Sequence, residues 1–291
     1  MRFKIIKFYA ITFAVLVFSA CDTIDKPYLE ENSGKCGNGS LSIPIRKILL
    51  EDYTGHTCGN CPRAAEQTEL LIETYCDHII PVAVHAGFFA EPYVSGKYTY
   101  DFRTTTGYAW DGFFGNASAG LPNGMVNRIE YNGTKILAYE SWAAAVEQLL
   151  KEPPKINIKI ENNFSQGTRD LKTSVDISFL KSASEELKLS VLIVEDSIIN
   201  WQKDYEYVDL ENPGNTDIEN YVHRHVLRGT INGDWGDTIV EDGVEQGKTI
   251  NKSFTYVLNP EWLAENCSVI AFVYQDNTKE VIQADVSKLI E

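Results

Sequence analysis

The chain has 291 residues, of which 44% are hydrophobic and 11% are aromatic, so it can bury a sizeable core. Its formal net charge is −15, and so acidic a chain repels nucleic acid and anionic lipid headgroups. We therefore exclude nucleic-acid binding. We also expect no cofactor, because the sequence contains no phosphate loop and no dinucleotide fingerprint.

The first segment of the chain has the pattern of an export signal. A basic start is followed by an apolar run over residues 8–18 and then by Ser19-Ala20-Cys21. Small residues directly before a cysteine resemble the lipobox of bacterial lipoproteins, which implies that Cys21 is lipidated and becomes the mature N-terminus. Phe18 departs from the aliphatic residue of that pattern, and an ordinary signal peptide with a chance cysteine is the alternative. We predict a signal peptide over residues 1–20 and a lipidated tether over residues 21–40.

A pair of cysteines separated by two residues is the strongest chemical motif of the chain. Cys58 and Cys61 stand between an apolar run and a helix-like run that begins at Pro62. This spacing lets the two sulfurs close a small disulfide ring, and the amino end of the helix stabilises a thiolate on Cys58. Proline is tolerated in the first helical turn, because its missing N–H would have no helical partner there. The motif therefore predicts a disulfide that could take part in thiol–disulfide exchange.

The first half of the chain alternates between strand and helix patterns. We predict strands over residues 46–53 and 78–85, and helices over residues 62–75 and 141–151. A strand, helix and strand in this order form a βαβ unit. With Gly120-Leu121-Pro122 downstream, the series resembles thioredoxin. The prediction is a thioredoxin-like domain over residues 41–152.

The thioredoxin resemblance implies roles for three further residues. It implies that Asp52 is a buried acid that accepts a proton from the second cysteine, although Glu51 could instead be the inward acid. It also implies that Pro122 is a cis proline facing the dithiol and that Leu121 offers backbone hydrogen bonds to a bound peptide. A solvated position at a strand end is the alternative for either acid.

An aromatic-rich insertion occupies residues 88–119 of this domain. Its residues from 101 to 114 have a helical pattern interrupted by Gly107 and Gly112. Aromatic side chains at this density either pack a core or a domain interface, or they line a binding surface beside the dithiol.

The second half changes to the alternating pattern of half-buried strands. Glu152-Pro153-Pro154 marks a boundary, and about seven alternating segments follow it. We predict an all-β sandwich domain of the immunoglobulin-like kind over residues 153–291.

Two further sets of residues have open interpretations. His223 and His225 could face one side of a strand as a metal pair, but a polar surface or interdomain cluster is the alternative, and we predict no metal site. Cys36, Cys76 and Cys267 remain after the Cys58–Cys61 pair. A bridge between Cys36 and Cys76 is one pairing, and buried thiols are the alternative.

The order of these motifs resembles one family over nearly the whole mature chain. The segments are the lipobox, Thr54-Gly55-His56-Thr57-Cys58-Gly59-Asn60-Cys61-Pro62, Gly120-Leu121-Pro122, and His223-Arg224-His225-Val226-Leu227-Arg228. The chain resembles the Bacteroidetes outer-membrane lipoproteins named after a 28-kilodalton outer-membrane protein. That resemblance implies a thioredoxin-like domain followed by an immunoglobulin-like β domain, and a lipid anchor in the outer membrane. Either the periplasmic or the surface face is compatible with it.

Two functions follow from these patterns. The first is thiol–disulfide exchange on envelope or surface proteins, with Cys58 as the attacking thiolate and Cys61 as the resolving thiol. The second is a non-enzymatic binding or adhesion lipoprotein, in which the Cys58–Cys61 disulfide is structural. Some members of the resembled family are regarded as surface adhesins, and thioredoxin folds also serve as scaffolds without redox activity.

Overall fold

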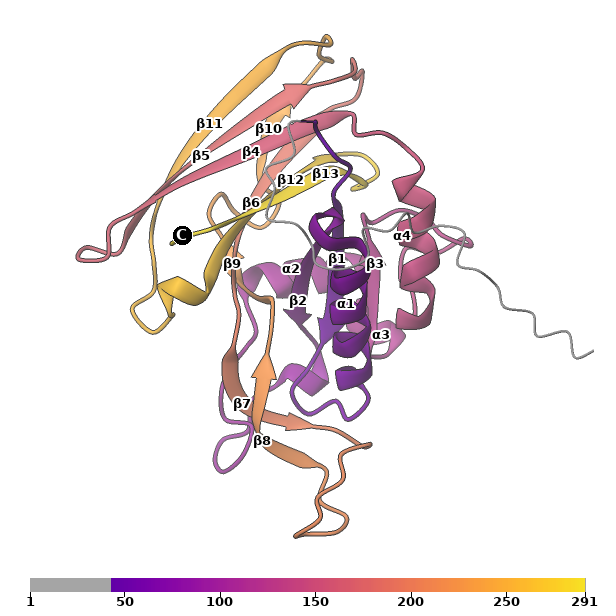
Figure 1. Ribbon diagram of the computed structural model, residues 1–291, viewed down its shortest axis with the longest axis vertical. Helices are drawn as coiled ribbons and strands as arrows, with labels where there is room; N and C mark the ends of the chain where they lie inside the picture. The colour runs from indigo at the N-terminus through magenta and orange to yellow at the C-terminus, as the bar shows by residue number, and fades with distance from the viewer. Residues whose placement is uncertain (1–42, 291) are drawn as a thin grey trace, which may run out of the picture. The chain divides into compact units, whose positions relative to one another are not determined.

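The computed structural model describes residues 43–290, with helices and strands in the first half and almost only strands in the second (Figure 1). The predicted signal peptide, the lipidation site Cys21 and the tether lie outside the described residues. Within residues 43–290, no helix is long and apolar enough to cross a bilayer. The predicted order, a mixed α/β part followed by a strand-rich part, is confirmed.

The elements of the first half agree closely with the sequence patterns. They are β1 (Ile48–Thr54), α1 (Cys61–Tyr75), β2 (Ile79–His85), α2 (Thr105–Phe114), α3 (Asn116–Ala119), β3 (Asn123–Val126) and α4 (Trp142–Leu150). Short 3₁₀ turns lie at Cys76–His78, Phe88–Ala90 and Tyr139–Ser141. Helix α2 starts later than its pattern predicts, because the Thr104 side chain caps it by accepting a hydrogen bond from the Gly107 N–H at 2.9 Å.

The second half contains more strands than the alternating segments predicted. Its strands are β4 (Ile156–Phe164), β5 (Asp170–Phe179), β6 (Leu187–Glu195), β7 (Ile198–Lys203), β8 (Asp217–His223), β9 (Val226–Thr230), β10 (Asp237–Val240), β11 (Thr249–Val257), β12 (Cys267–Gln275) and β13 (Val281–Lys288). The four strands from β7 to β10 had no clear alternation in the sequence. They are short, and much of their surface stays half-exposed.

One sheet joins strands from both halves of the chain. Its order is β13-β12-β6-β9-β2-β1-β3, and β10 pairs with β6. The junction is a parallel contact in which the Ala83 N–H of β2 donates to the His225 carbonyl before β9 at 2.8 Å. The β-rich half thus covers the edge of β2, which would otherwise present unpaired backbone groups. The division at residue 152 stays a prediction, and the sheet runs across it.

Alternation along β1 assigns its side chains to two different cores. Ile48 and Leu50 pack with α1 and α4 on one face of the sheet. Leu49 and Tyr53 pack on the other face with Trp110 of α2 and with residues of β12. Since neighbouring residues of a strand point to opposite faces, Glu51 and Asp52 must also diverge.

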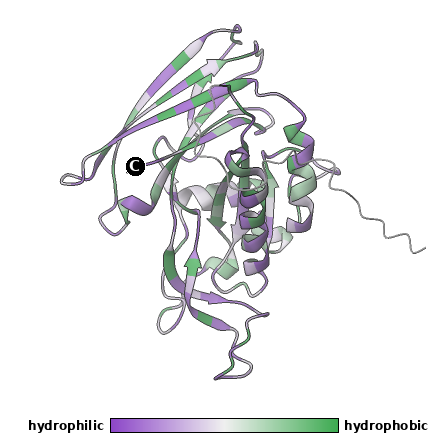
Figure 2. Cartoon of the chain, viewed as in Figure 1, coloured by the Kyte–Doolittle hydropathy of each residue, from purple (hydrophilic) through white to green (hydrophobic). Residues whose placement is uncertain are grey.

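A second, three-stranded sheet of order β11-β5-β4 covers the strand-rich end of the large sheet. Its inner residues share a hydrophobic core with β6 and β12. Hydrophobic and hydrophilic residues take turns along β4, β5 and β11, since only one face of this sheet is covered (Figure 2). Strands β6 and β12 are buried nearly throughout, because they have a core on each face.

Candidate functional site

The predicted Cys58–Cys61 disulfide is present at the start of α1. Cys61 is the first residue of the helix, and Pro62 follows in its first turn. The Cys58 and Cys61 side chains are only 3% and 1% exposed. The disulfide therefore lies below the molecular surface.

Asp52 lies on the α1 face of the sheet, where the thioredoxin resemblance placed the buried acid. It is 5% exposed, and its Oδ1 atom has no hydrogen-bond partner within the protein. Burial without a compensating partner penalises the charged form and raises the pKa of Asp52 to about 7. This carboxyl can therefore give or take a proton near neutral pH.

Glu51 is also buried, but on the opposite face and with a different role. Its carboxylate receives two hydrogen bonds from the Arg128 guanidinium, at 2.7 and 2.8 Å. The guanidinium also lies over the rings of Trp110, Phe114 and Phe272, at 4.7 to 5.1 Å from the ring centroids. Glu51 is thus part of an internal ion pair, and Asp52 is the acid on the disulfide side.

The Leu121–Pro122 peptide bond is cis. Strand β3 begins directly after it, and Asn123 of β3 is the register partner of Tyr53. The cis bond therefore lies beside the carboxyl end of β1. Residues 55–60, which we call the cysteine loop, lead from this end of β1 to α1. Contact of Leu121 and Pro122 with a partner peptide stays a prediction.

A hairpin from the second half covers the cysteine loop. It consists of β7 and β8 with the loop between them, and backbone hydrogen bonds join it to the cysteine loop. The Lys203 N–H donates to the His56 carbonyl at 2.8 Å, and the Tyr205 N–H donates to the Gly59 carbonyl at 2.9 Å. Gln202 is buried, and its Nε2 donates to the Cys58 carbonyl at 3.0 Å. A Cβ atom at Gly59 would lie 2.6 Å from the Tyr205 ring, so any other residue there would displace the ring from this position.

Ion pairs fasten the same hairpin to α1. Arg63, the second residue after Cys61, pairs with Asp204 at 2.9 Å and with Glu206 at 2.6 Å. We expect Arg63→Gln to expose the end of the hairpin, because each partly exposed pair contributes up to about 1 kcal/mol and the two act together. Amide hydrogen exchange at Tyr205 should accelerate about tenfold. Arg103→Gln, which removes an exposed pair with Asp101, is the control, and equal exchange in both variants would contradict the fastening role.

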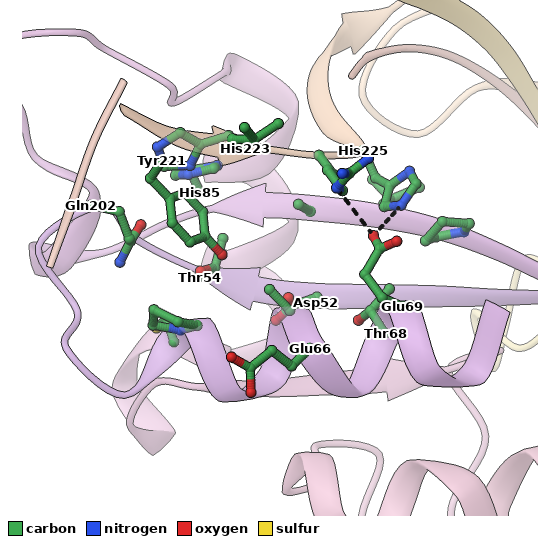
Figure 3. A pocket seen from close by; sticks show the side chains of 18 residues that line it. Asp52, Thr54, Glu66, Thr68, Glu69, His85, Gln202, Tyr221, His223 and His225 are labelled. Carbon is green, nitrogen blue, oxygen red and sulfur yellow. Dashed lines mark hydrogen bonds and ion pairs between the residues drawn. The ribbon is translucent and has the colours of Figure 1, made fainter. Parts of the chain in front are cut away.

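A cleft of about 270 Å³ lies between α1 and residues 221–225 (Figure 3). Residues of β1, β2, α1 and the hairpin line it, among them Asp52, Thr54, Cys61, Thr68, His85, Gln202, Tyr221 and His223. Exposed residues of α1 and of the 221–225 segment, such as Glu66 and Arg224, line its mouth. The cleft runs between α1 and the hairpin and reaches the disulfide at Cys61.

Two histidines that line the cleft are held neutral by burial. Burial lowers the pKa of His85 well below its usual range, and it lowers the pKa of His223 to about 3. Neither ring nitrogen of His85 has a hydrogen-bond partner within the protein. The His85 ring stacks on Phe102 at 4.5 Å and lies 5.8 Å from the His223 ring.

The third histidine of the cleft lies outside the strand that the sequence predicted. Strand β8 ends at His223, so His225 follows it in a turn with a positive φ of 54°. Its two ring nitrogens contact Glu69 at 3.1 Å and Asp196 at 3.2 Å, and Figure 3 shows the contact with Glu69. Among residues 43–290, no group of three or more histidine, cysteine or acidic residues could hold a metal ion. The polar-cluster interpretation of these histidines agrees with these contacts.

The aromatic insertion contains both buried and exposed side chains. Tyr98, Phe102 and Trp110 are buried and belong to the packing around the site. Phe88 and Tyr108 are 77% and 83% exposed. The Phe89 carbonyl accepts hydrogen bonds from the N–H and Oγ1 of Thr57, which holds this exposed end against the cysteine loop.

The remaining cysteines are separate from this site. Cys267 is a buried free thiol, and burial raises its pKa to about 12, so it is inert. Cys76 is disulfide-bonded. Its predicted partner, Cys36, lies outside the described residues.

The sequence patterns did not predict most of the residues that the second half of the chain contributes to the site. Gln202, Tyr205 and Tyr221 meet the cysteine loop or the cleft from more than 140 residues away. The only available signal was the density of polar and aromatic residues around His223, which by itself indicates no contact.

Comparisons with known proteins give the family of the chain. The family model described as outer membrane protein Omp28 matches residues 113–290. A search of curated proteins found no match.

Three solved structures resemble parts of the chain. A crystal structure of a domain of the outer membrane lipoprotein Omp28 from Porphyromonas gingivalis is 25% identical, with a TM-score of 0.31, and covers 47% of this chain and 88% of its own. A protein from Agrobacterium tumefaciens is 12% identical, with a TM-score of 0.50, and covers 86% of this chain and 97% of its own. A FixG-related protein from Vibrio parahaemolyticus is 12% identical, with a TM-score of 0.25, and covers 47% of this chain and 96% of its own.

The similarity to the Agrobacterium protein supports the mixed α/β fold across most of the chain. It supports the fold only and gives no information about function. The family match covers more than half of the sequence and includes the cis proline, the hairpin and the histidine segment. The chain therefore belongs to the Omp28 family of outer membrane proteins.

Proposed function

We propose that this outer membrane protein carries out thiol–disulfide exchange with its Cys58–Cys61 pair. The supporting observation is the buried carboxyl of Asp52 on the disulfide side of the sheet, without a hydrogen-bond partner for its Oδ1 and with its pKa raised by burial to about 7. A structural disulfide needs no proton acceptor, and burying this carboxyl unpaired costs free energy.

The proposed roles follow the thioredoxin-like arrangement of residues 41–152. In the reduced state, Cys58 at the amino end of α1 is the attacking thiolate, and Cys61 is the resolving thiol. Asp52 accepts the proton of Cys61. Leu121 and Pro122 position the disulfide of an envelope or surface protein, and the immunoglobulin-like residues 153–291 supply the hairpin that covers the pair. Lipidation at Cys21 anchors the chain in the membrane.

The reduction potential of the pair tests this proposal first. A dithiothreitol or glutathione titration with thiol trapping should give a potential between about −270 and −120 mV, the range of working oxidoreductases. A value well below about −300 mV would instead indicate a structural disulfide.

Cysteine variants test the individual roles. We expect Cys58→Ser to lower the rate of insulin disulfide reduction to the uncatalysed rate, because the substitution removes the attacking thiolate. Cys61→Ser should trap mixed disulfides, since the resolving thiol is missing. Cys267→Ser removes a buried free thiol and is the matched control, with unchanged activity. Wild-type activity in Cys58→Ser would refute the proposal.

A binding or adhesion role is the second candidate. Both sulfurs are buried, and the insertion leaves Phe88, Tyr108 and Phe113 exposed for contact with a ligand. A potential in the structural range would favour this role, and substitution of these three residues by serine would then test ligand binding without disturbing the buried aromatic residues.

A further inference from the structure

The hairpin closes the outer side of Cys58 to large partners. Hydrogen bonds from Gln202, Lys203 and Tyr205 occupy the carbonyls of Cys58, His56 and Gly59. The Tyr205 ring also lies against Gly59 between the two cysteines. A protein thiol can therefore reach the Cys58 sulfur only after these contacts break.

The cleft runs between α1 and the hairpin residues Gln202 and Tyr221, and it reaches Cys61. Cys61 lines it, and Cys58 does not. Its volume of about 270 Å³ lies at the lower end of small-molecule sites and is far too small for a protein segment with its neighbours. Its mouth is open between the exposed residues Glu66 and Arg224, so a small molecule can enter from solvent.

The inner wall of the cleft carries polar groups that lack partners. Asp52 Oδ1 and both ring nitrogens of His85 are buried, and none of the three accepts or donates a hydrogen bond within the protein. Figure 3 shows both side chains among those that line the cleft. Buried polar atoms are nearly always paired, so these groups fit a polar molecule in the cleft. Three acidic side chains, Asp52, Glu66 and Glu69, line the cleft, which favours an uncharged molecule over an anionic one.

We infer that an uncharged low-molecular-weight thiol enters this cleft and reduces the disulfide by attack on the Cys61 sulfur. This inference rests on the proposed function, and it names the class of molecule that supplies electrons to the Cys58–Cys61 disulfide. Cys58 remains covered by the hairpin during this step, and its thiolate becomes available to a partner once the hairpin opens.

The chemistry of the step favours Cys61 as the sulfur that is attacked. The thiolate RS⁻ bonds to Cys61, the Cys58–Cys61 bond breaks, and Cys58 leaves with the electron pair. The amino end of α1 stabilises that leaving thiolate, and a better leaving thiolate departs faster. A second thiol then attacks the sulfur of R, releases RSSR, and leaves Cys61 to take a proton from Asp52. Overall, two RSH are oxidised to RSSR and release two protons, and the protein disulfide gains two electrons. One proton restores Asp52 after it has protonated Cys61, and the other goes to solvent, because Cys58 stays a thiolate.

Filling the cleft tests the route of entry. Ala65 lines the cleft on α1, and Gln67 lies on the same helix outside the cleft. We expect Ala65→Leu to lower the second-order rate of reduction by 2-mercaptoethanol by about tenfold or more, because access limits the exchange rate. Gln67→Leu should stay within about twofold of the wild type, since its side chain cannot narrow the cleft. Thermal unfolding of each variant verifies that the fold is intact.

The position of the first adduct tests which sulfur reacts. In Cys58→Ser, hydroxyethyl disulfide should modify Cys61 rapidly. In Cys61→Ser, it should modify Cys58 slowly, as peptide mapping by mass spectrometry would show. Reduced thioredoxin, a large thiol, should reduce the wild-type disulfide more slowly than 2-mercaptoethanol at equal thiolate concentration.

The outcomes separate this inference from the proposed function. Equal rates in Ala65→Leu and Gln67→Leu, or faster modification of Cys58, would overturn the inference while leaving the redox pair intact. A disulfide that no thiol reduces without unfolding the protein would refute the proposed function itself.

Discussion

Arg128→Met is expected to lower the free energy of unfolding by about 3–5 kcal/mol, the largest effect of any substitution we propose. The Arg128 and Glu51 side chains are 1% and 0% exposed, and their charged atoms are 2.7 Å apart. Removing the guanidinium leaves the Glu51 carboxylate inside the apolar core of Leu49, Trp110 and Phe272 without a partner. Urea unfolding at neutral pH measures the loss.

A second substitution separates two free energies: the destabilisation by an unpaired buried charge and the net stabilisation by the intact Glu51–Arg128 pair. The double variant Glu51→Met with Arg128→Met should regain most of the lost stability, because no charge then remains buried. Arg103→Met, which removes an exposed pair with Asp101, is the control and should cost less than about 1 kcal/mol. A small loss in Arg128→Met alone would mean that water reaches Glu51.

Asp52→Asn should stabilise the protein above neutral pH and leave it nearly unchanged at pH 4. The folded-state pKa of Asp52 is raised to about 7 by burial, and an unfolded aspartate has a pKa of about 3.9. The folded chain thus holds this proton more tightly, so the Asp52 contribution to stability falls as pH rises from about 4 to 7. Three pKa units correspond to roughly 4 kcal/mol of folding free energy that the wild type has lost by pH 8. The Asp52→Asn variant keeps this stability, because an amide does not ionise.

The comparison must be made at each pH, because other buried groups titrate in the opposite sense. His85 and His223 have lowered pKa values in the folded state, so their contributions are lost as pH falls below about 6.5 in both proteins. The difference in urea unfolding between Asp52→Asn and the wild type isolates the carboxyl. Asp242→Asn, at an exposed bend, is the control and should show no trend with pH. Destabilisation by Asp52→Asn at pH 8 would indicate that the ionised carboxyl has a stabilising partner.

The local elements were readable from the sequence because short-range patterns specify them. The apolar run before Cys58, the proline after Cys61 and the periodicity of the next residues determined β1, the start of α1 and the disulfide. The cis bond at Pro122 also agreed with the thioredoxin resemblance. Alternation predicted β4, β5, β6, β11, β12 and β13, since each has a face or a whole strand in a core.

Tertiary structure alone decided what surrounds the disulfide. The sequence left Glu51 and Asp52 as rivals, and the packing places one with Arg128 and the other in the cleft. Nothing in a linear pattern indicates that Gln202 and Tyr205 will cover Cys58, because their hydrogen bonds go to backbone carbonyls that every residue possesses. The parallel contact between β2 and β9 likewise depends on a long-range pairing that local periodicity does not encode. The sequence by itself therefore determined the Cys58–Cys61 motif and its immediate frame, and the folded chain determined which distant residues surround the disulfide.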